Sequence, residues 1–368
     1  MGFDQFLGNE RIVKSLRGML AAKRVPSAML FLGPKGVGKY TLARMFAQAA
    51  NCERMQDDFC GKCDTCVRIA RLAEPSALIE QGLAERGESA DAGMVERVPL
   101  ILQTHPDVWA IVPDPVRLKK PVVRPVIHMG QLRAIQRAAN FRPQARRRLF
   151  LLDGAETMRW DLSSIFLKIL EEPPESSTLI LMAPSPYQLQ PTIVSRCLQF
   201  FFAPVGQNEM EEILRERTKL DAAGRTQAAE LSEGSPGAAL GMDVDQATEL
   251  RRQALRILEL SADGKLPGLF SLTNQLTKRE GGQAVPFDSL LGALYSVLAD
   301  LLELTSASDK PQLRNPSLKK ELQTLGSKLN TPWVTRAVRG VDTLSYRHRR
   351  NINRQLALDA LGATLSAD

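Results

Sequence analysis

The chain has 368 residues, of which 44% are hydrophobic, and this length predicts roughly two or three domains rather than one core. No apolar run approaches the roughly 20 residues of a membrane helix, and the N-terminal segment has early acidic residues and no signal-type stretch, so we expect a cytoplasmic protein without a membrane partner. The net charge of +7 is compatible with polyanion binding, but alone it is weak evidence for nucleic-acid binding.

The first predicted elements are a strand at 29–32, a glycine-rich loop at 33–41 and a helix that follows it. The loop, GPKGVGKYT, matches the pattern GxxxxGK[ST] except at its last position and places the phosphate-binding positions at Gly33, Gly36, Gly38 and Lys39. Backbone N–H groups at the start of such a helix can bind a phosphate. Tyr40 replaces the magnesium-binding hydroxyl, and Thr41 lies about 100° further round the helix. The loop therefore predicts a site that holds phosphate but hydrolyses it poorly.

Four of the five cysteines lie close together after this helix, at Cys52, Cys60, Cys63 and Cys66. Two CxxC steps that share Cys63 offer thiolates at a spacing suited to tetrahedral zinc. A shell of four sulfurs leaves no open position for water, so we expect a structural zinc ion. A redox pair or unligated thiols are the alternatives.

Residues 72–104 carry little strand signal and predict an insertion with a partly mobile loop, to which we assign no chemistry. Later strands are predicted at 108–112, 148–153 and 178–183, with a less certain one at 122–127. Helices are predicted between them, over 129–141 and from a cap at Asp161 to a stop at Pro173. Alternating short apolar strands and helices predict a parallel sheet with helices on both faces and a nucleotide site at the carboxyl ends of the strands.

After Pro204 the strand signal disappears, and the remaining amphipathic helices are interrupted by glycines at 234–237, 264–268 and 281–282. The fold class is therefore α/β followed by all-α. We expect three parts: residues 1–205, with a zinc module at 52–66 and the insertion at 72–104; a small helical unit at 206–243; and a larger helical unit at 244–368.

A hydrolytic site also needs a carboxylate for magnesium and a base that orients water. Asp153, at the end of the strand RLFLLD, fits the first role. The next residue, Gly154, has no side chain for the second role. Glu156 lies further along, and we expect it to cap or begin the next helix rather than replace the missing base.

Taken in order, GPKGVGKYT, the cysteine stretch, LFLLDGAETM, LKILEEPPESSTLILMA and LQPTIVSRC resemble the AAA+ clamp-loader subunits of bacterial DNA polymerase III. The resemblance covers most of residues 1–205 and implies an AAA+ P-loop domain, a lid domain at 206–243 and an oligomerising collar domain at 244–368. It also implies a glutamate at the position of Gly154 in active members. Arg196, in the SRC segment, is then an arginine finger for ATP held by a neighbouring subunit. The alternative for Arg196 is a strand-end arginine paired with a local carboxylate.

Two kinds of subunit within this family share the fold, the gamma/tau ATPase and the delta-prime subunit. The resemblance implies that active members carry the motif GSxR in the lid, where the arginine reaches the γ-phosphate. This chain has GSPG, so Gly237 stands at the position of that arginine. The resemblance therefore favours a mostly non-hydrolysing delta-prime subunit. It implies a hetero-pentamer with gamma/tau and delta subunits that loads the sliding clamp on primed DNA. The HPDVW segment at 105–109 and the tail NINRQLALDALGATL also resemble delta-prime.

Two other interpretations remain open at this point. The chain could be an active gamma/tau-type ATPase that uses Thr41 and Glu156, and the retained Lys39 is its best evidence; the loop could also hold ATP or phosphate for stability alone. Direct DNA binding is the other interpretation, indicated by basic runs at 142–148 and 346–354. Charge runs are usually solvated faces, and neither run has the interleaved aromatic residues of a stacking platform.

Overall fold

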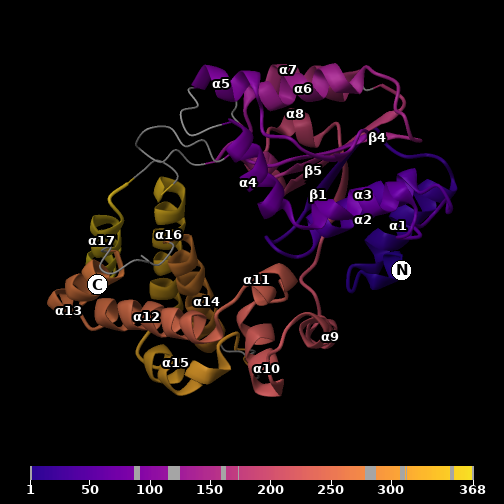
Figure 1. The fold of residues 1–368 in the computed structure, drawn as a ribbon. Helices are drawn as coiled ribbons and strands as arrows, with labels where there is room; N and C mark the ends of the chain where they lie inside the picture. The colour runs from indigo at the N-terminus through magenta and orange to yellow at the C-terminus, as the bar shows by residue number, and fades with distance from the viewer. Residues whose placement is uncertain are drawn as a thin grey trace. The chain divides into compact units, whose positions relative to one another are not determined.

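The computed structural model describes residues 2–86, 92–114, 125–158, 163–172, 174–277, 287–306, 311, 313–348 and 352–366 (Figure 1). Within these residues the chain divides into two compact units. The first comprises Met1–Glu216 with Gly234–Ala238, and the second comprises Arg217–Glu233 with Ala239–Asp368. None of the helices in the described ranges has the length and apolarity needed to cross a membrane.

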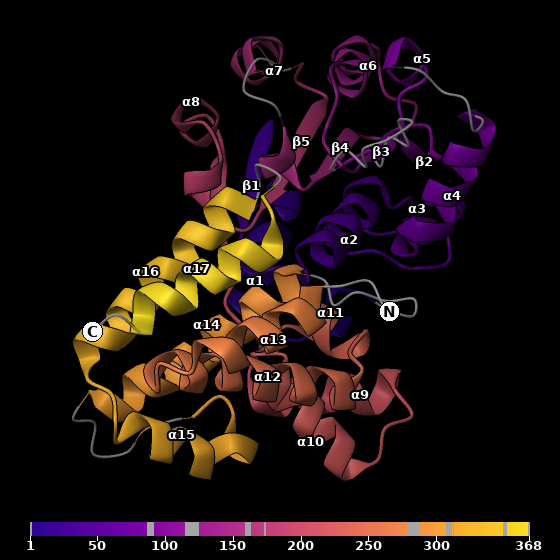
Figure 2. The same cartoon turned by 90° about the vertical axis from the view of Figure 1, so that its left-hand side faces the viewer.

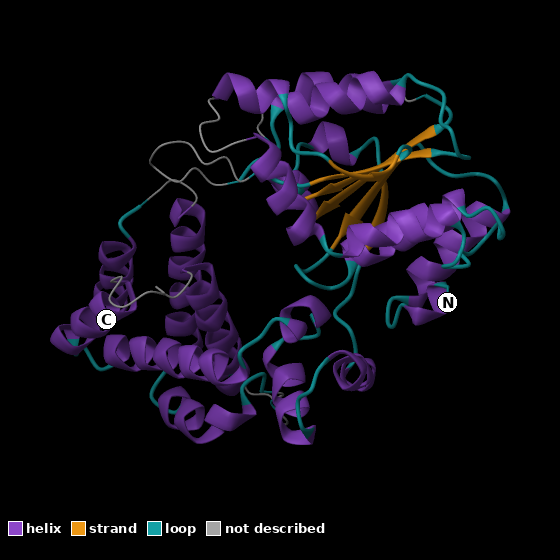
Figure 3. Ribbon diagram, in the orientation of Figure 1, coloured by secondary structure: helices purple, strands orange, loops and turns teal. Residues whose placement is uncertain are grey.

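The first unit is built on a six-stranded sheet in the order β2-β3-β4-β5-β1-β6 (Figure 3). The strands are β1 (Ala28–Leu32), β2 (Leu102–His105), β3 (Val108–Ile111), β4 (Arg148–Asp153), β5 (Ser177–Ala183) and β6 (Leu198–Phe201). Five of them run parallel, as predicted, whereas β2 pairs antiparallel with β3 at one edge. β1 and β5 are buried along their whole length, which explains their continuous apolar sequences.

Helices cover both faces of this sheet (Figure 1). Successive side chains of a strand alternate between two cores, since they point to opposite faces. Met29 and Phe31 lie in the core formed with α1 (Glu10–Ala21), α2 (Lys39–Asn51) and α3 (Asp64–Ala70). Leu30 and Leu32 lie in the core formed with α6 (Met129–Ala139), α7 (Ser163–Glu171) and α8 (Pro191–Val194). The predicted cap and stop of α7, Asp161 and Pro173, lie outside the described residues, as do residues 122–124 of the uncertain strand at 122–127.

The stretch at 72–104 contains more regular structure than its sequence indicated. It holds α4 (Pro75–Arg86), α5 (Ala92–Arg97) and strand β2, where we expected no strand. The strand signal is weak because β2 has only four residues and buries only its two ends. The expected loop includes residues 87–91, which lie outside the described ranges.

A buried ion pair fastens α4 to the end of β3. Arg86 donates from both terminal nitrogens to the Asp114 carboxylate, at 2.9 and 2.7 Å, and from Nε to the carbonyl of Val98. The two side chains are 3% and 0% exposed. Removal of either partner would leave an uncompensated buried charge, so this pair helps to hold α4 beside the segment that follows β3.

The second unit is all-α, as the sequence predicted. Its helices are α10 (Ala222–Leu231), α12 (Val244–Ala262), α13 (Leu266–Thr277), α14 (Phe287–Thr305), α15 (Lys319–Gly326), α16 (Thr331–His348) and α17 (Arg354–Ser366). α9 (Gln207–Arg217) leads into this unit, and α11 (Pro236–Leu240) spans the boundary between the two units. Figure 2 shows α16 and α17 lying side by side, and both contribute leucines to one core with α12 and α14. The predicted break at 264–268 separates α12 from α13, whereas 281–282 lies outside the described residues.

Candidate functional site

The glycine-rich loop joins the carboxyl end of β1 to the start of α2, as the sequence predicted. Gly38 is the N-cap of α2, and Gly33, Gly36 and Gly38 all have positive φ angles, of 144°, 80° and 103°. Side chains strain such a backbone, so glycine is required at these three positions. The loop thus forms a helix N-terminus of the kind that binds phosphate.

Lys39 and Asp153 come together at this loop. Lys39 is buried, and its Nζ donates to the carbonyls of Gly33 and Pro34 at 2.6 and 2.7 Å. Burial lowers the pKa of Lys39, while the charges of Asp153 and Glu156 act in the opposite direction. Burial likewise raises the pKa of Asp153, and Lys39 partly offsets that increase. The three groups therefore form one electrostatic cluster, although the roles assigned to them stay predictions.

The hydroxyl of Tyr40 forms a hydrogen bond inside the protein. It donates to the carbonyl of Leu72 at 2.9 Å, and the ring packs against the core that contains α2. Burial raises the pKa of this phenol well above its usual range. Thr41, the next residue of α2, is exposed. The loop backbone fits a phosphate, but Tyr40 does not fit the role of a magnesium ligand.

Residues 234–238 lie directly on the loop within the first unit. The N–H of Gly237 donates to the carbonyl of Gly36 at 2.8 Å, and the Ser235 hydroxyl donates to the carbonyl of Lys35 at 2.7 Å. A Cβ atom at Gly237 would stand 2.9 Å from the Gly36 Cα, and one at Gly36 would stand 2.5 Å from the Ser235 Oγ. No side chain fits on either glycine unless the loop shifts. The sequence showed that an arginine is missing at 237, but it gave no signal for this contact.

Gly154 is also constrained by its surroundings. Its φ angle is 71°, and a Cβ atom there would stand 2.8 Å from the Cγ of Pro113. A glutamate at this position would be strained and would collide with that ring. Glu156 lies in the short 3-10 helix Ala155–Thr157 that follows Gly154, consistent with our expectation that it begins the next helical turn.

Arg196 lies just after α8 (Pro191–Val194). Its Nη2 pairs with the Oε1 of Glu171 at 2.8 Å, and its Nη1 donates to the carbonyl of Thr192 at 3.0 Å. The two paired side chains are 37% and 48% exposed. The alternative that the sequence left open, a local carboxylate partner, is therefore present in this structure. The finger role of Arg196 stays a prediction, and nothing in the sequence singled out Glu171.

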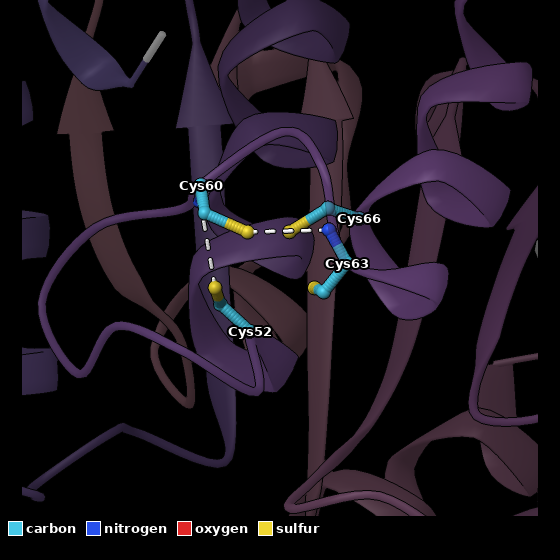
Figure 4. A group of neighbouring side chains, drawn as sticks. All are labelled: Cys52, Cys60, Cys63 and Cys66. Carbon is cyan, nitrogen blue, oxygen red and sulfur yellow. Dashed lines mark hydrogen bonds between the residues drawn. The ribbon is translucent and has the colours of Figure 1, made fainter.

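The four clustered cysteines converge as their spacing predicted (Figure 4). All four sulfurs lie within 4.8 Å of one another, close to the roughly 3.8 Å that separates sulfurs around a tetrahedral zinc ion with Zn–S bonds of about 2.3 Å. The amides of Cys60, Lys62 and Cys63 donate to cysteine sulfurs at 3.3–3.5 Å. The N–H groups of Lys62 and Cys63 lower the pKa of the Cys60 thiol to about 6. These features fit a bound metal ion held by four thiolates.

The cluster is fastened to the helix that begins at the phosphate loop. Cys52 is the C-cap residue of α2, and Gln48 of the same helix donates to the carbonyl of Cys66 at 2.9 Å. The fifth cysteine, Cys197, is buried elsewhere, and burial raises its pKa to about 12. The four clustered cysteines therefore stabilise the C-terminal end of α2, whereas the phosphate loop lies at its N-terminal end.

The basic run at 142–148 is largely occupied by contacts inside the protein. Arg148 forms a buried pair with Asp107 of the HPDVW segment at 2.7 Å. Arg147 donates to the carbonyl of Ser177 at 3.0 Å, and Arg146 donates to the carbonyl of Met55, also at 3.0 Å. These contacts explain three of the run's arginines without nucleic acid. The other basic run, at 346–354, includes residues 349–351, which lie outside the described ranges.

Comparison with known proteins shows that the sequence is similar to subunits of DNA polymerase III. Residues 8–206 match the family described as DNA polymerase III, delta subunit. DNA polymerase III subunit delta' of Bacillus subtilis is 24% identical over 293 residues, which are 78% of this chain and 77% of that protein. Subunit tau of the same organism is 26% identical over 326 residues, which are 86% of this chain and 46% of that protein. This chain therefore spans about half the length of that tau subunit.

Solved structures resemble the chain over nearly its full length, but only loosely. A gamma subunit-related protein of DNA polymerase III from Thermotoga maritima aligns with a TM-score of 0.43 and 16% identity, covering 96% of this chain and 98% of that one. A RuvB variant from the same organism aligns with a TM-score of 0.39 and 14% identity, covering 81% of this chain and 73% of that one.

Proposed function

Because the chain belongs to the family described as DNA polymerase III, delta subunit, we propose that it is a delta-prime-type clamp-loader subunit that hydrolyses little or no ATP itself. The observation that carries this proposal is the hydrogen bond from the Tyr40 hydroxyl to the carbonyl of Leu72. Phosphoryl transfer needs a magnesium ion held beside the phosphates, and P-loop enzymes use a serine or threonine hydroxyl for this purpose. Here the residue at that position is a tyrosine whose hydroxyl is already bonded.

Two further positions support a loop that binds without hydrolysing. Gly154 has no side chain to orient a water molecule, and both its φ angle and Pro113 oppose a larger residue. Gly237 likewise has no room for an arginine, because it lies on Gly36. The loop is then a static site for ATP or phosphate, or an empty remnant.

In this proposal the chain acts through its partners. It joins gamma/tau and delta subunits in a hetero-pentamer that places the sliding clamp on primed DNA, and Arg196 serves as an arginine finger in trans. Residues 1–205 form the AAA+ domain, 206–243 the lid and 244–368 the oligomerising collar. An arginine finger works by neutralising charge that develops on the transferred phosphoryl group.

The metal of the cysteine cluster is zinc in this proposal, held by Cys52, Cys60, Cys63 and Cys66. Zinc supplies a structural cross-link here, because four thiolates complete its coordination. The cross-link joins the C-terminal end of α2 to the start of α3. It thereby keeps α2, and the loop before it, in a fixed position on the sheet.

One observation favours the competing gamma/tau-type ATPase. Glu156 lies close enough to Lys39 to affect its pKa, so a displaced base is present near the loop. That interpretation also requires Thr41 to replace Tyr40 as the magnesium ligand, and Thr41 is exposed on α2.

Measurement of ATP turnover separates the two functions. The isolated chain is expected to show no turnover above background, and the reconstituted loader is expected to show reduced DNA-stimulated turnover when this chain carries Arg196→Ala. Turnover by the isolated chain that disappears in Lys39→Ala would instead establish the ATPase. Unchanged turnover of the loader with Arg196→Ala, in a complex that still assembles, would remove the finger role.

A further inference from the structure

The guanidinium of Arg196 is held at two points, and only one of them is ionic. Its Nη1 donates to the carbonyl of Thr192, one turn back along its own chain. Its Nη2 pairs with Glu171, which belongs to a different element and is the last residue of α7. The side chain therefore bends back toward α7 instead of extending freely into solvent.

The position of Glu171 is not explained by the requirements of its helix. The C-terminal end of a helix carries partial negative charge, so a carboxylate there is unfavourable unless a cation lies nearby. Arg196 provides that cation. Glu172, the next residue after Glu171, is also exposed at this end of α7. Within the described residues the structure records no ion pair for Glu172. Two adjacent glutamates thus differ in whether they contact the arginine.

The exposure of this pair makes it exchangeable. Both side chains are more than one third exposed, and ion pairs of this kind contribute little to stability. A nucleotide phosphate offers the same guanidinium more negative charge and several acceptor oxygens. A phosphate can therefore displace the carboxylate at small cost.

We propose that Glu171 is a positioning residue that holds Arg196 against α7 until the phosphates of a nucleotide in a neighbouring subunit replace its carboxylate. The inference rests on the proposed finger role of Arg196 and adds the residue that competes for it. The exchange breaks one ion pair and forms another, with no covalent step. Glu171 thereby raises the ATP concentration at which the neighbouring site engages the finger.

The test uses the reconstituted loader and measures the ATP concentration that gives half-maximal DNA-stimulated turnover. Glu171→Gln keeps the shape of the side chain and removes its charge, so this concentration should fall about two- to five-fold, the range expected for losing one exposed ion pair. Glu171→Asp retains a carboxylate and should remain close to the parent. Glu172→Gln removes a charge of the same sign from the same helix end and should have no effect.

A double variant and a salt series show whether the effect acts through Arg196. In the Arg196→Ala background, Glu171→Gln should change nothing, because the arginine that it releases is gone. The difference between Glu171→Gln and the parent should also shrink as salt rises, since salt already weakens the exposed pair. A purely structural role for Glu171 would persist in the Arg196→Ala background and at high salt.

The outcomes separate this inference from the proposed function. If Arg196→Ala leaves turnover unchanged, the finger role and the Glu171 inference both fail. If Arg196→Ala lowers turnover while Glu171→Gln leaves the half-maximal ATP concentration unchanged or raises it, only the Glu171 inference is overturned. A fall with Glu171→Gln that is absent in the double variant supports both.

Discussion

Replacement of Tyr40 by threonine would restore the residue type that a hydrolytic loop needs, and we expect it to restore no activity. The tyrosine hydroxyl donates to the carbonyl of Leu72, and the ring packs against the first core. Tyr40→Thr removes both contacts. It leaves Gly154 and Gly237 in place, so the water-orienting base and the lid arginine are still missing.

The two contacts set the size of the expected loss in stability. A neutral hydrogen bond contributes about 0.5–1.5 kcal/mol, and Tyr40→Phe removes only that bond. Truncation of a packed aromatic ring costs several kcal/mol when the site cannot collapse, and Tyr40 is partly buried. We therefore expect a decrease of about 1 kcal/mol in the free energy of unfolding for Tyr40→Phe and of about 2–4 kcal/mol for Tyr40→Thr.

Urea unfolding followed by circular dichroism measures the free energy of unfolding of each variant. Release of phosphate from ATP measures its hydrolytic activity. Tyr40→Phe is the matched control, because it retains the ring and, like the parent, offers no hydroxyl to a magnesium ion. The reasoning would be refuted if Tyr40→Thr hydrolysed ATP on its own while remaining as stable as the parent. Such a result would mean that position 40 alone silences the site.

Three other predictions address the metal, the loop contact and the partly buried Asp153 carboxylate. Metal analysis should find one zinc ion per chain, which is lost in Cys63→Ser together with thermal stability and retained in Cys197→Ser. Gly237→Ala should lower the free energy of unfolding by about 1–3 kcal/mol, because the added Cβ meets the backbone of the loop. Gly18→Ala is the control, since Gly18 is an exposed helical residue with open space around it. This variant should raise the free energy of unfolding by about 0.5–1 kcal/mol. Asp153→Asn should stabilise the chain at pH 7, because burial opposes the charged carboxylate. That gain should vanish as the pH falls below the usual carboxyl range of about 4, where Asp153 is protonated in both states. Equal effects of Gly237→Ala and Gly18→Ala, or a gain for Asp153→Asn that does not change with pH, would contradict these explanations.

The interior strands and the phosphate loop could be predicted because their signals are local. β1, β4 and β5 are buried on both faces, and this burial requires the continuous apolar runs seen in the sequence. The short edge strands β2 and β6 were not predicted. β6 has only four residues and buries only Phe200, so it is too short for its sequence to show a periodic pattern.

The candidate site was predicted only in part, for a related reason. The cysteines lie within 15 consecutive residues, and their spacing alone indicates a shared metal ion. The surroundings of the basic run at 142–148 could not be predicted, because charge in a sequence does not show whether an arginine meets solvent or, like Arg148, a buried aspartate. The sequence shows that an arginine is present, but only the packed structure shows which group it pairs with.

The sequence by itself determined the phosphate loop, the cysteine cluster and the residue types at positions 40, 154 and 237, because each is a matter of residue identity at a fixed spacing. The tertiary structure decided what surrounds those three positions and which carboxylate pairs with Arg196. The Ser235 hydroxyl reaches a loop carbonyl 200 residues away in the chain, and Arg196 meets Glu171 at the end of another helix. Contacts of this kind depend on where packed elements place two side chains, and no periodicity along the chain encodes them.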